Sequence, residues 1–254
     1  MPLEQVLVLL VAAAGAGWVD AVVGGGGLVQ LPAILMTGLP TVEAMATNKL
    51  SSVFGTTSAA VAYARSTKID RQVALPGAGL AVLSAGLGAS AAAAISAEVL
   101  RPVVMVVLLG VAAFVTLRPA LGAVPVPHLR TRGRVLAAVA VAGVGIAFYD
   151  GIMGPGTGTF LIIAFTTILG LDFVSASASA KIINVGTNLG ALVVFGVQGH
   201  LNWGLGLGMA VCNVAGAQLG ARMALKRGTG FVRIVLLCVV VALVARLAWQ
   251  QFGG

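Results

Sequence analysis

Charged residues are scarce in this chain of 254 residues, and their scarcity excludes the commonest class of protein. Only 9% of the residues are charged, against roughly 25% in an ordinary soluble domain. By contrast, 59% are hydrophobic, and the mean hydropathy is +1.07. A soluble fold covers its surface with polar groups, and this chain has too few of them. The composition therefore predicts an all-α integral membrane protein with several spans.

The residues that build metal centres and catalytic sites are also scarce. The chain has only two cysteines and two histidines. Cys212 and Cys238 lie inside apolar runs, and His128 and His200 lie in loops without ligand companions, so neither a metal site nor a cofactor is predicted. The sequence contains no HExxH, GxSxG or GxxxxGK[ST] motif. These absences argue against an intramembrane enzyme and against transport driven by ATP bound to this chain.

The net charge of +8 raises the question of a nucleic-acid partner. The Lys and Arg residues, however, lie in short gaps between apolar runs, a distribution that is typical of charge that sets membrane topology. We therefore expect a lipid bilayer and a small substrate as partners, and no nucleic acid.

Ten apolar stretches follow one another along the chain. A helix needs about 20 apolar residues to cross a bilayer, because each residue adds about 1.5 Å. Two of the stretches are too short for this, and each of the two follows a glycine-rich break. The predicted helices cover about 3–23, 28–38, 42–64, 72–96, 99–118, 135–152, 159–170, 173–198, 201–225 and 230–250.

The last five stretches repeat the first five at an offset of about 130 residues. An acid, a glycine break and an intramembrane lysine recur in the same order, which two unrelated apolar segments would rarely produce. The predicted units are repeat 1 at 1–122, a basic cytoplasmic connector at 123–134, and repeat 2 at 135–254. The matched pairs are Asp20 and Asp150, Gly24 and Gly154, and Lys49 and Lys181.

Basic residues gather in three gaps, and such gaps mark the cytoplasmic side of a membrane. All three can be cytoplasmic if each glycine-broken pair makes an even number of crossings, as a re-entrant hairpin or as two short spans. Each half then contains such a pair plus three transmembrane helices, the halves are inverted, and both termini lie outside. A single broken span in each half would overturn this prediction. The basic residues are Arg65, Lys68 and Arg71, then Arg118, Arg130, Arg132 and Arg134, then Lys226, Arg227 and Arg233.

The two glycine-rich breaks mark the predicted substrate site. Consecutive glycines hold a helix poorly, and Pro155 removes a backbone donor. Irregular backbone survives at membrane depth only where it is buried or lines a watery cavity, and paired breaks indicate a transport site. The helix that restarts after a break favours an anion, whereas the helix that ends there offers carbonyls to a cation. The break residues predicted to bind substrate are Gly24, Gly25, Gly26, Gly27, Gly154, Gly156, Thr157 and Gly158.

Lys49 and Lys181 favour an anion over a cation. Inserting a lysine near the centre of a membrane helix costs roughly 2.5–3.5 kcal/mol of free energy. Two such lysines at equivalent positions therefore indicate a functional role. Each shares a helical stripe with amide or hydroxyl groups, and such donors suit an oxyanion. Alternatively, the lysines pair with acids, cap a broken helix, or extend to the interface. The other predicted substrate ligands are Thr47, Asn48, Ser52, Asn184 and Asn188.

Asp20 and Asp150 are single acids at membrane depth. Either could carry a coupling proton, and either could instead serve only as the partner of a nearby lysine. Gly216 and Gly220 form a GxxxG pattern that predicts close helix packing, against either another helix of this chain or a second subunit. The sequence therefore leaves it open whether the protein forms a homo-oligomer.

Taken together, these motifs resemble the sulfite exporter TauE/SafE family of bacterial membrane transporters. The resemblance rests on the glycine break at 24–27, on Thr47-Asn48-Lys49-Leu50-Ser51-Ser52, and on the echo of that motif at 180–188. It implies an all-helical transporter of the inner membrane that moves sulfite, an organosulfonate or a related sulfur anion outward. An anion channel, or a transporter of a cation or another organic anion, are the alternatives.

Overall fold

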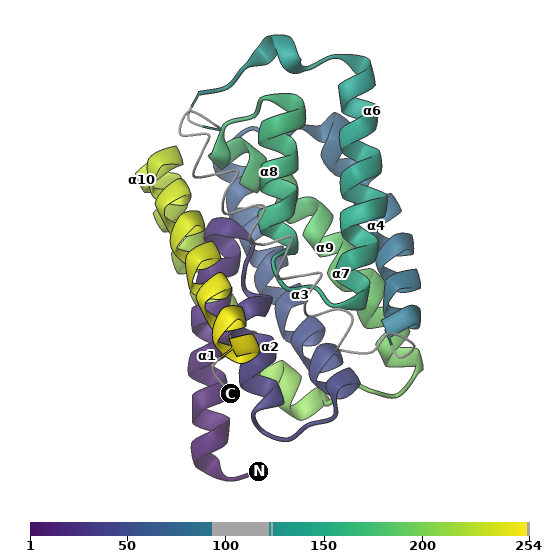
Figure 1. The fold of residues 1–254 in the computed structure, drawn as a ribbon, viewed down its shortest axis with the longest axis vertical. Coiled ribbons are helices and arrows are strands. Elements are labelled where there is room, and N and C mark those ends of the chain that lie inside the picture. The colour runs from purple at the N-terminus through teal and green to yellow at the C-terminus, as the bar shows by residue number, and fades with distance from the viewer. Residues whose placement is uncertain (93–121, 123, 253–254) are drawn as a thin grey trace.

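The computed structural model describes residues 1–92, 122 and 124–252, and every regular element in that part of the chain is a helix (Figure 1). Five helical segments are long and apolar enough to cross a membrane, which confirms an all-helical, multi-pass membrane protein. The predicted helix at 99–118 and Arg118 lie outside the described residues. The five segments are Leu3–Val23, Arg71–Ala91, Arg132–Ile152, Phe173–Val197 and Trp203–Val239.

The first half is built around a helix that stops inside the protein. Helix α1 (Leu3–Val23) ends at Gly24, which has a left-handed backbone (φ 77°) and donates its N–H to the carbonyl of Asp20 at 2.7 Å. Helix α2 (Gly27–Leu35) follows with nine residues, which is too few to cross a bilayer. Two longer helices complete the described part of this half, α3 (Thr41–Ser66) and α4 (Arg71–Ala91).

The second half begins with one continuous helical run of three labelled parts. These are α6 (Arg132–Ala140), the π-helical turn η3 (Val141–Ile146) and α7 (Ala147–Ile152). The π-helix was not predicted, since nothing in the apolar pattern distinguishes it from an ordinary turn. After the break at 153–156 come α8 (Thr157–Leu169), α9 (Phe173–Val197) and α10 (Trp203–Phe252).

Helix α10 is two helices joined at Gly228. That residue has φ 73° and ψ −165° inside an otherwise helical run of 50 residues. A glycine tolerates this backbone conformation without the steric cost that a Cβ would add. The break lies between the predicted helices at 201–225 and 230–250, so the sequence pattern located it correctly.

Helices α3 and α9 form the interior of the bundle. Helix α3 has 26 residues but is too polar to count among the five apolar segments. It packs against both α9 and α10, and α9 in turn packs against α4. Because these neighbours cover it, α3 can carry polar side chains that lipid would not accept. The predicted GxxxG face also packs inside the chain, since Gly216 and Gly220 lie against backbone carbonyls of α1.

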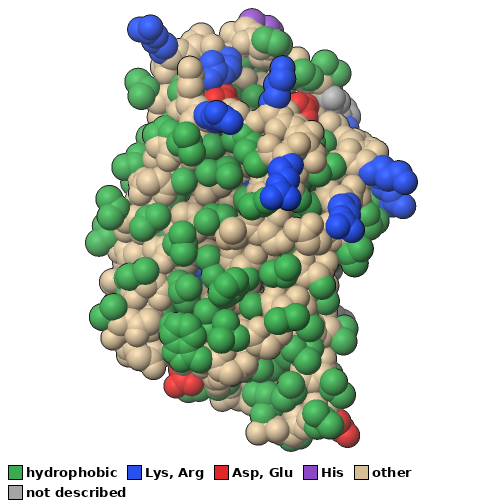
Figure 2. All heavy atoms as spheres, turned by 180° about the vertical axis from the view of Figure 1, so that it is seen from behind, with side chains coloured by type: hydrophobic (Ala, Val, Ile, Leu, Met, Phe, Trp, Pro, Cys, Tyr) green, Lys and Arg blue, Asp and Glu red, His purple; other side chains and the backbone are tan. Residues whose placement is uncertain are grey.

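Positive charge gathers at one end of the molecule. In Figure 1 the two termini lie in the lower half, whereas the segment that leads through η2 (Pro127–Leu129) into α6 runs over the top. Figure 2 shows Lys and Arg side chains in the upper part of the opposite face, with hydrophobic side chains scattered over the middle and lower parts. Directly after η2, Arg130 binds both carboxylate oxygens of Asp70, at 2.8 and 3.0 Å. This ion pair raises the pKa of Arg130 above its usual value.

Candidate functional site

The two glycine breaks touch each other inside the protein. The N–H of Gly158, at the start of α8, donates to the carbonyl of Gly24 at 3.1 Å. A Cβ added to Gly24 would lie 2.2 Å from Cα of Gly158, and one added to Gly158 would lie 2.3 Å from Cα of Gly24. Only glycine at both positions permits this approach. The breaks are therefore buried packing points between the halves, and the structure brings them together at one site.

The carbonyl end of α1 is capped along its whole last turn. In an isolated helix these last carbonyls would lack partners. Here, hydroxyl, ammonium and amide donors reach them, mostly from the second half of the chain. The pairs are Lys181 to Asp20, Tyr63 to Ala21, Ser177 to Val22, Thr159 to Val23, and the Gly158 amide to Gly24. Because these carbonyls are already hydrogen-bonded, they offer little to a bound cation.

Each of the two lysines pairs with an acid from the other half of the chain. Nζ of Lys49 in α3 lies 2.6 Å from Oδ2 of Asp150 in α7. Nζ of Lys181 in α9 lies 3.2 Å from Oδ2 of Asp20 in α1, and it also donates to the main-chain carbonyl of Asp20. Each lysine thus neutralises the acid of the other half. In this conformation both lysines pair with acids, which was one of the alternatives that the sequence left open.

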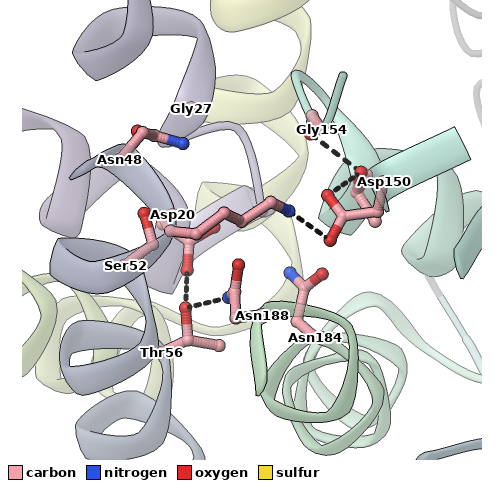
Figure 3. A pocket seen from close by; sticks show the side chains of 12 residues that line it. Asp20, Gly27, Asn48, Ser52, Thr56, Asp150, Gly154, Asn184 and Asn188 are labelled. Atoms are coloured by element: carbon pink, nitrogen blue, oxygen red, sulfur yellow. Dashed lines mark hydrogen bonds and ion pairs between the residues drawn. The ribbon is translucent and has the colours of Figure 1, made fainter. Parts of the chain in front are cut away.

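Hydroxyl and amide groups extend both ion pairs. Thr56 donates to Oδ2 of Asp20 at 3.1 Å, and Asn188 donates to the Thr56 hydroxyl at 3.4 Å. On the other side, the hydroxyl of Thr157 donates to Oδ1 of Asp150 at 2.6 Å. Figure 3 shows Thr56, Asn188 and Asp150 converging from α3, α9 and α7. Each ion pair is therefore supported by further hydrogen bonds of its own, as buried charges require.

A cavity of about 20 Å³ lies between these groups, which is room for about one water molecule. It collects most of the residues predicted to bind substrate, together with both acids. Lys181, Thr47, Gly25, Gly26, Gly156 and Gly158 do not line it. The lining residues are Asp20, Gly24, Gly27, Asn48, Lys49, Ser52, Thr56, Asp150, Gly154, Thr157, Asn184 and Asn188.

Two parts of this site were absent from the predicted ligand set. Thr56 lines the cavity, and its position seven residues after Lys49 on one stripe was the signal that could have placed it there. A buried hydrogen bond joins Nδ2 of Asn213 in α10 to Oε1 of Gln30 in α2, at 2.7 Å. The signal for Gln30 was a single amide within an apolar run, which is weak evidence of any role.

Comparison with known proteins identifies the family. The family model for the sulfite exporter TauE/SafE family matches residues 9–247. The chain belongs to this family. This match confirms the resemblance that the sequence motifs predicted. Since the family consists of membrane transporters, it implies that the protein transports a substrate and is not an enzyme. No solved structure matches this TauE/SafE chain.

Relatives of this TauE/SafE protein carry general names. It is 37% identical over 239 residues to "Probable membrane transporter protein ORF9" of Sinorhizobium sp, covering 94% of this chain and 90% of the relative. It is 30% identical over 246 residues to "Probable membrane transporter protein YfcA" of Escherichia coli strain K12, covering 97% and 90%. A "Probable membrane transporter protein" of Haemophilus influenzae is 29% identical over 236 residues.

The chemistry available at this TauE/SafE site is charge and hydrogen bonding. No group of three or more His, Cys, Asp or Glu side chains that could hold a metal occurs among the described residues. The cavity instead presents one ammonium, three amides and three hydroxyls beside two carboxylates. Ammonium, amide and hydroxyl donors match the oxygen atoms of a small anion. The carboxylates would repel that anion unless they were protonated or moved.

Proposed function

We propose that this chain is a secondary transporter that exports a small oxyanion, sulfite or an organosulfonate, by alternating access. The anion would bind between the two halves, among the residues that line the cavity. The family supports transport in general, and the donor set at the cavity supports an oxyanion in particular.

One observation carries the choice of an anion. Lys49 faces the cavity, and among the described side chains it is held by Asp150 alone, at 2.6 Å. An oxyanion can take the place of that carboxylate without leaving the ammonium unpaired, whereas a cation would have to displace the lysine itself. The capped carbonyls of α1 also argue against a cation. These features favour an anion over the cation alternative.

The size of the cavity favours a carrier over a channel. With room for about one water molecule, it cannot hold sulfite without a change of conformation. Its walls include the buried ion pair of Lys49 and Asp150, both 3% exposed. In this proposal, binding breaks the pair, and breaking it loosens the contact between the halves. A channel would instead need a continuous wet pore between the two sides.

The two lysines would then have different roles. Lys181 is fully buried, does not line the cavity, and binds both the carbonyl and the carboxylate of Asp20. We assign Lys181 the positioning of the α1 end and Lys49 the contact with substrate. Asp150, freed from Lys49 when protonated, would carry the coupling proton, with Asp20 as the second candidate.

Alternating access is supported by the proposed inverted repeats, at 1–122 and 135–254 around the connector at 123–134. Each half has a helix that stops at a glycine break and a short helix after it, α2 or α8. Basic side chains gather at one end of the molecule, and the termini lie toward the other (Figures 1 and 2). We therefore propose that both termini face the periplasm from the bacterial inner membrane and that the connector is cytoplasmic.

Transport in proteoliposomes tests the function. Purified protein is reconstituted into vesicles loaded with sulfite, taurine or sulfoacetate, and efflux is measured against protein-free vesicles. We expect saturable efflux of one of these anions, reduced about 10- to 100-fold by Lys49→Met, the effect of removing a hydrogen bond to a charged group. Lys68→Met changes an exposed lysine and should leave efflux unchanged.

Two outcomes would contradict the proposal. A folded Lys49→Met variant with normal efflux would remove Lys49 from the site. A rate that rises linearly with concentration, without saturation, would favour the channel.

A further inference from the structure

In the part of the chain that the structure describes, four buried polar side chains near the cavity each have one atom without a hydrogen-bond partner. The unpartnered atoms are Nε2 of Gln30, Oγ1 of Thr47, Oδ1 of Asn48 and Oγ of Ser51. Gln30, Thr47 and Ser51 are fully buried, and Asn48 is 6% exposed. Buried polar atoms are almost always hydrogen-bonded, and leaving one unpaired is costly. Four in one region require an explanation beyond packing.

Three of these groups follow one another around α3. Thr47, Ser51 and Gly55 are four residues apart and lie on one stripe of the helix. Gly55 lies against α10, because a Cβ added to it would meet Oδ1 of Asn213 at 1.8 Å. Asn48 lies next to this stripe and also lines the cavity. The polar surface of α3 therefore continues from the cavity toward α10.

Helix α2 covers the same surface. Gly27 begins α2, and a Cβ added to it would lie 3.7 Å from Nδ2 of Asn48. Gln30, one turn later, accepts the hydrogen bond from Asn213 at 2.7 Å. The polar seam, consisting of Gln30, Thr47, Asn48 and Ser51, thus lies where α2, α3 and α10 meet. Among the described residues, the hydrogen bond between Gln30 and Asn213 is the only one that joins side chains of α2 and α10, and we call it the latch of the seam.

The matching positions of the other half, all of which the structure describes, form no such seam. The positions 132 residues after Asn48, Ser51 and Gln30 are Ala180, Ile183 and Ile162, which are apolar and fully buried. The fourth position, Ser179, donates to the carbonyl of Ser175 at 3.1 Å. The unpartnered groups therefore belong to one side of the molecule, and packing of a repeated fold does not require them.

We propose that this polar seam is the hydrated half of the transport path. It would join the cavity to the side of the membrane on which the termini lie, because α2, which covers it, lies with both termini in the lower half of Figure 1. The inference rests on the proposed function. Movement of α2 would open the seam, and water and the oxyanion would then supply the missing partners. Helix α2 suits such movement because it has only nine residues, contains Pro32, and is followed by the exposed Met36.

Cysteine accessibility tests the path in the full-length transporter. Cys212 and Cys238 are free and are first replaced by serine. Thr47→Cys and Ser51→Cys are then introduced singly, with Ala180→Cys and Ile183→Cys as controls at the matching positions of the second half. Each variant is treated with a membrane-impermeant methanethiosulfonate reagent from the side of the N-terminus, while sulfite efflux is measured in parallel.

We expect the reagent to modify positions 47 and 51, whereas positions 180 and 183 stay unmodified. Sulfoacetate, which unlike sulfite does not react with the thiosulfonate, should change the rate of modification at positions 47 and 51. Variants that transport sulfite but resist modification at both 47 and 51 would overturn the proposal. Equal modification at 183 would overturn it too, because the path would then not be confined to one half. Absence of sulfite efflux from every variant and from the parent would count against the proposed function, and the labelling pattern would still test the seam.

The latch is tested in the Ser51→Cys background. Replacing Gln30 by leucine removes the bond to Asn213, which should raise the rate of modification at position 51 about fivefold, the effect of losing one ordinary hydrogen bond. Leu35→Ala alters an exposed residue at the end of α2 and should leave the rate unchanged. An unchanged rate in the Gln30→Leu variant would mean that this bond does not hold the path closed.

Discussion

Nζ of Lys49 lies 2.6 Å from Oδ2 of Asp150, and these residues belong to different halves of the chain. The second pair, Lys181 with Asp20, crosses in the opposite sense. Each half thus contains a lysine and an acid at equivalent positions, but neither half neutralises its own. Substitutions in the two pairs can therefore separate the contribution of each pair to stability from its contribution to transport.

Removing the charge of Asp150 alone should destabilise the protein strongly. Asp150→Asn leaves the buried ammonium of Lys49 without its counter-ion, which costs about 3–5 kcal/mol when one partner of a buried pair is removed. The double variant Lys49→Met with Asp150→Asn buries no net charge and should recover most of the thermal stability. Thermal unfolding of the purified proteins in detergent measures both, and a double variant as unstable as the single one would contradict this reasoning.

Replacing both members of the second ion pair, Lys181 and Asp20, should affect transport less than replacing both members of the first. Lys181→Met with Asp20→Asn should fold and keep measurable sulfite efflux, because it leaves Lys49 and Asp150 in place, although Asp20 also lines the cavity. The Lys49→Met and Asp150→Asn double variant should fold without transport. Efflux from the two double variants in matched vesicles tests the assignment, which fails if both keep efflux or if both lose it.

Coupling to protons should depend on Asp150. If protonation of this carboxylate releases Lys49 to the anion, efflux from the parent protein responds to an imposed pH difference across the vesicle membrane. Asp150→Asn, examined where it folds or in a stabilised background, should show residual efflux that no longer responds to that difference. A response that persists in Asp150→Asn but is lost in Asp20→Asn would move the coupling to Asp20.

Contact between the glycine breaks should tolerate no side chain. Gly158→Ala would place a Cβ 2.3 Å from Cα of Gly24, and backbone on both sides cannot yield. We expect loss of both folded yield and efflux. Gly208→Ala is the matched control, since a Cβ there meets nothing within 4 Å, and it should behave as the parent. Normal efflux from Gly158→Ala would show that the breaks can separate.

Topology can be read with reporter fusions. We expect alkaline phosphatase to be active when fused to either terminus, and green fluorescent protein to fluoresce when inserted after Thr131 in the connector. The reason is the gathering of basic side chains at the connector end of the molecule. Fluorescence from a fusion at either terminus would contradict the proposed orientation.

Local features of the fold could be predicted well from the sequence. The first helix runs from Leu3 to Val23 as expected, and the chain breaks at Gly24 and Gly228, because apolar length and glycine act locally. The π-helix at Val141–Ile146 has no such local signature.

The sequence predicted which residues form the site better than it predicted the contacts between them. The repeat located Lys49, Lys181, Asp20 and Asp150 but could not say which lysine meets which acid. That choice depends on how two halves pack, and a residue offset contains no such information. For the same reason, Lys181 resembled Lys49 in the sequence, although only Lys49 lines the cavity.

The crossing of the ion pairs has a consequence for how the chain is made. Lys49 precedes Asp150 by 101 residues, so at about 5–20 residues per second the ribosome needs about 5–20 s to supply the partner. During that interval an unpaired lysine would face a cost of roughly 2.5–3.5 kcal/mol in the bilayer. We therefore expect nascent α3 to wait in a wet or protein-lined place, such as the insertion machinery, until the second half arrives. Final membrane entry of the interior helices is then a late event, completed only when synthesis has passed Lys181.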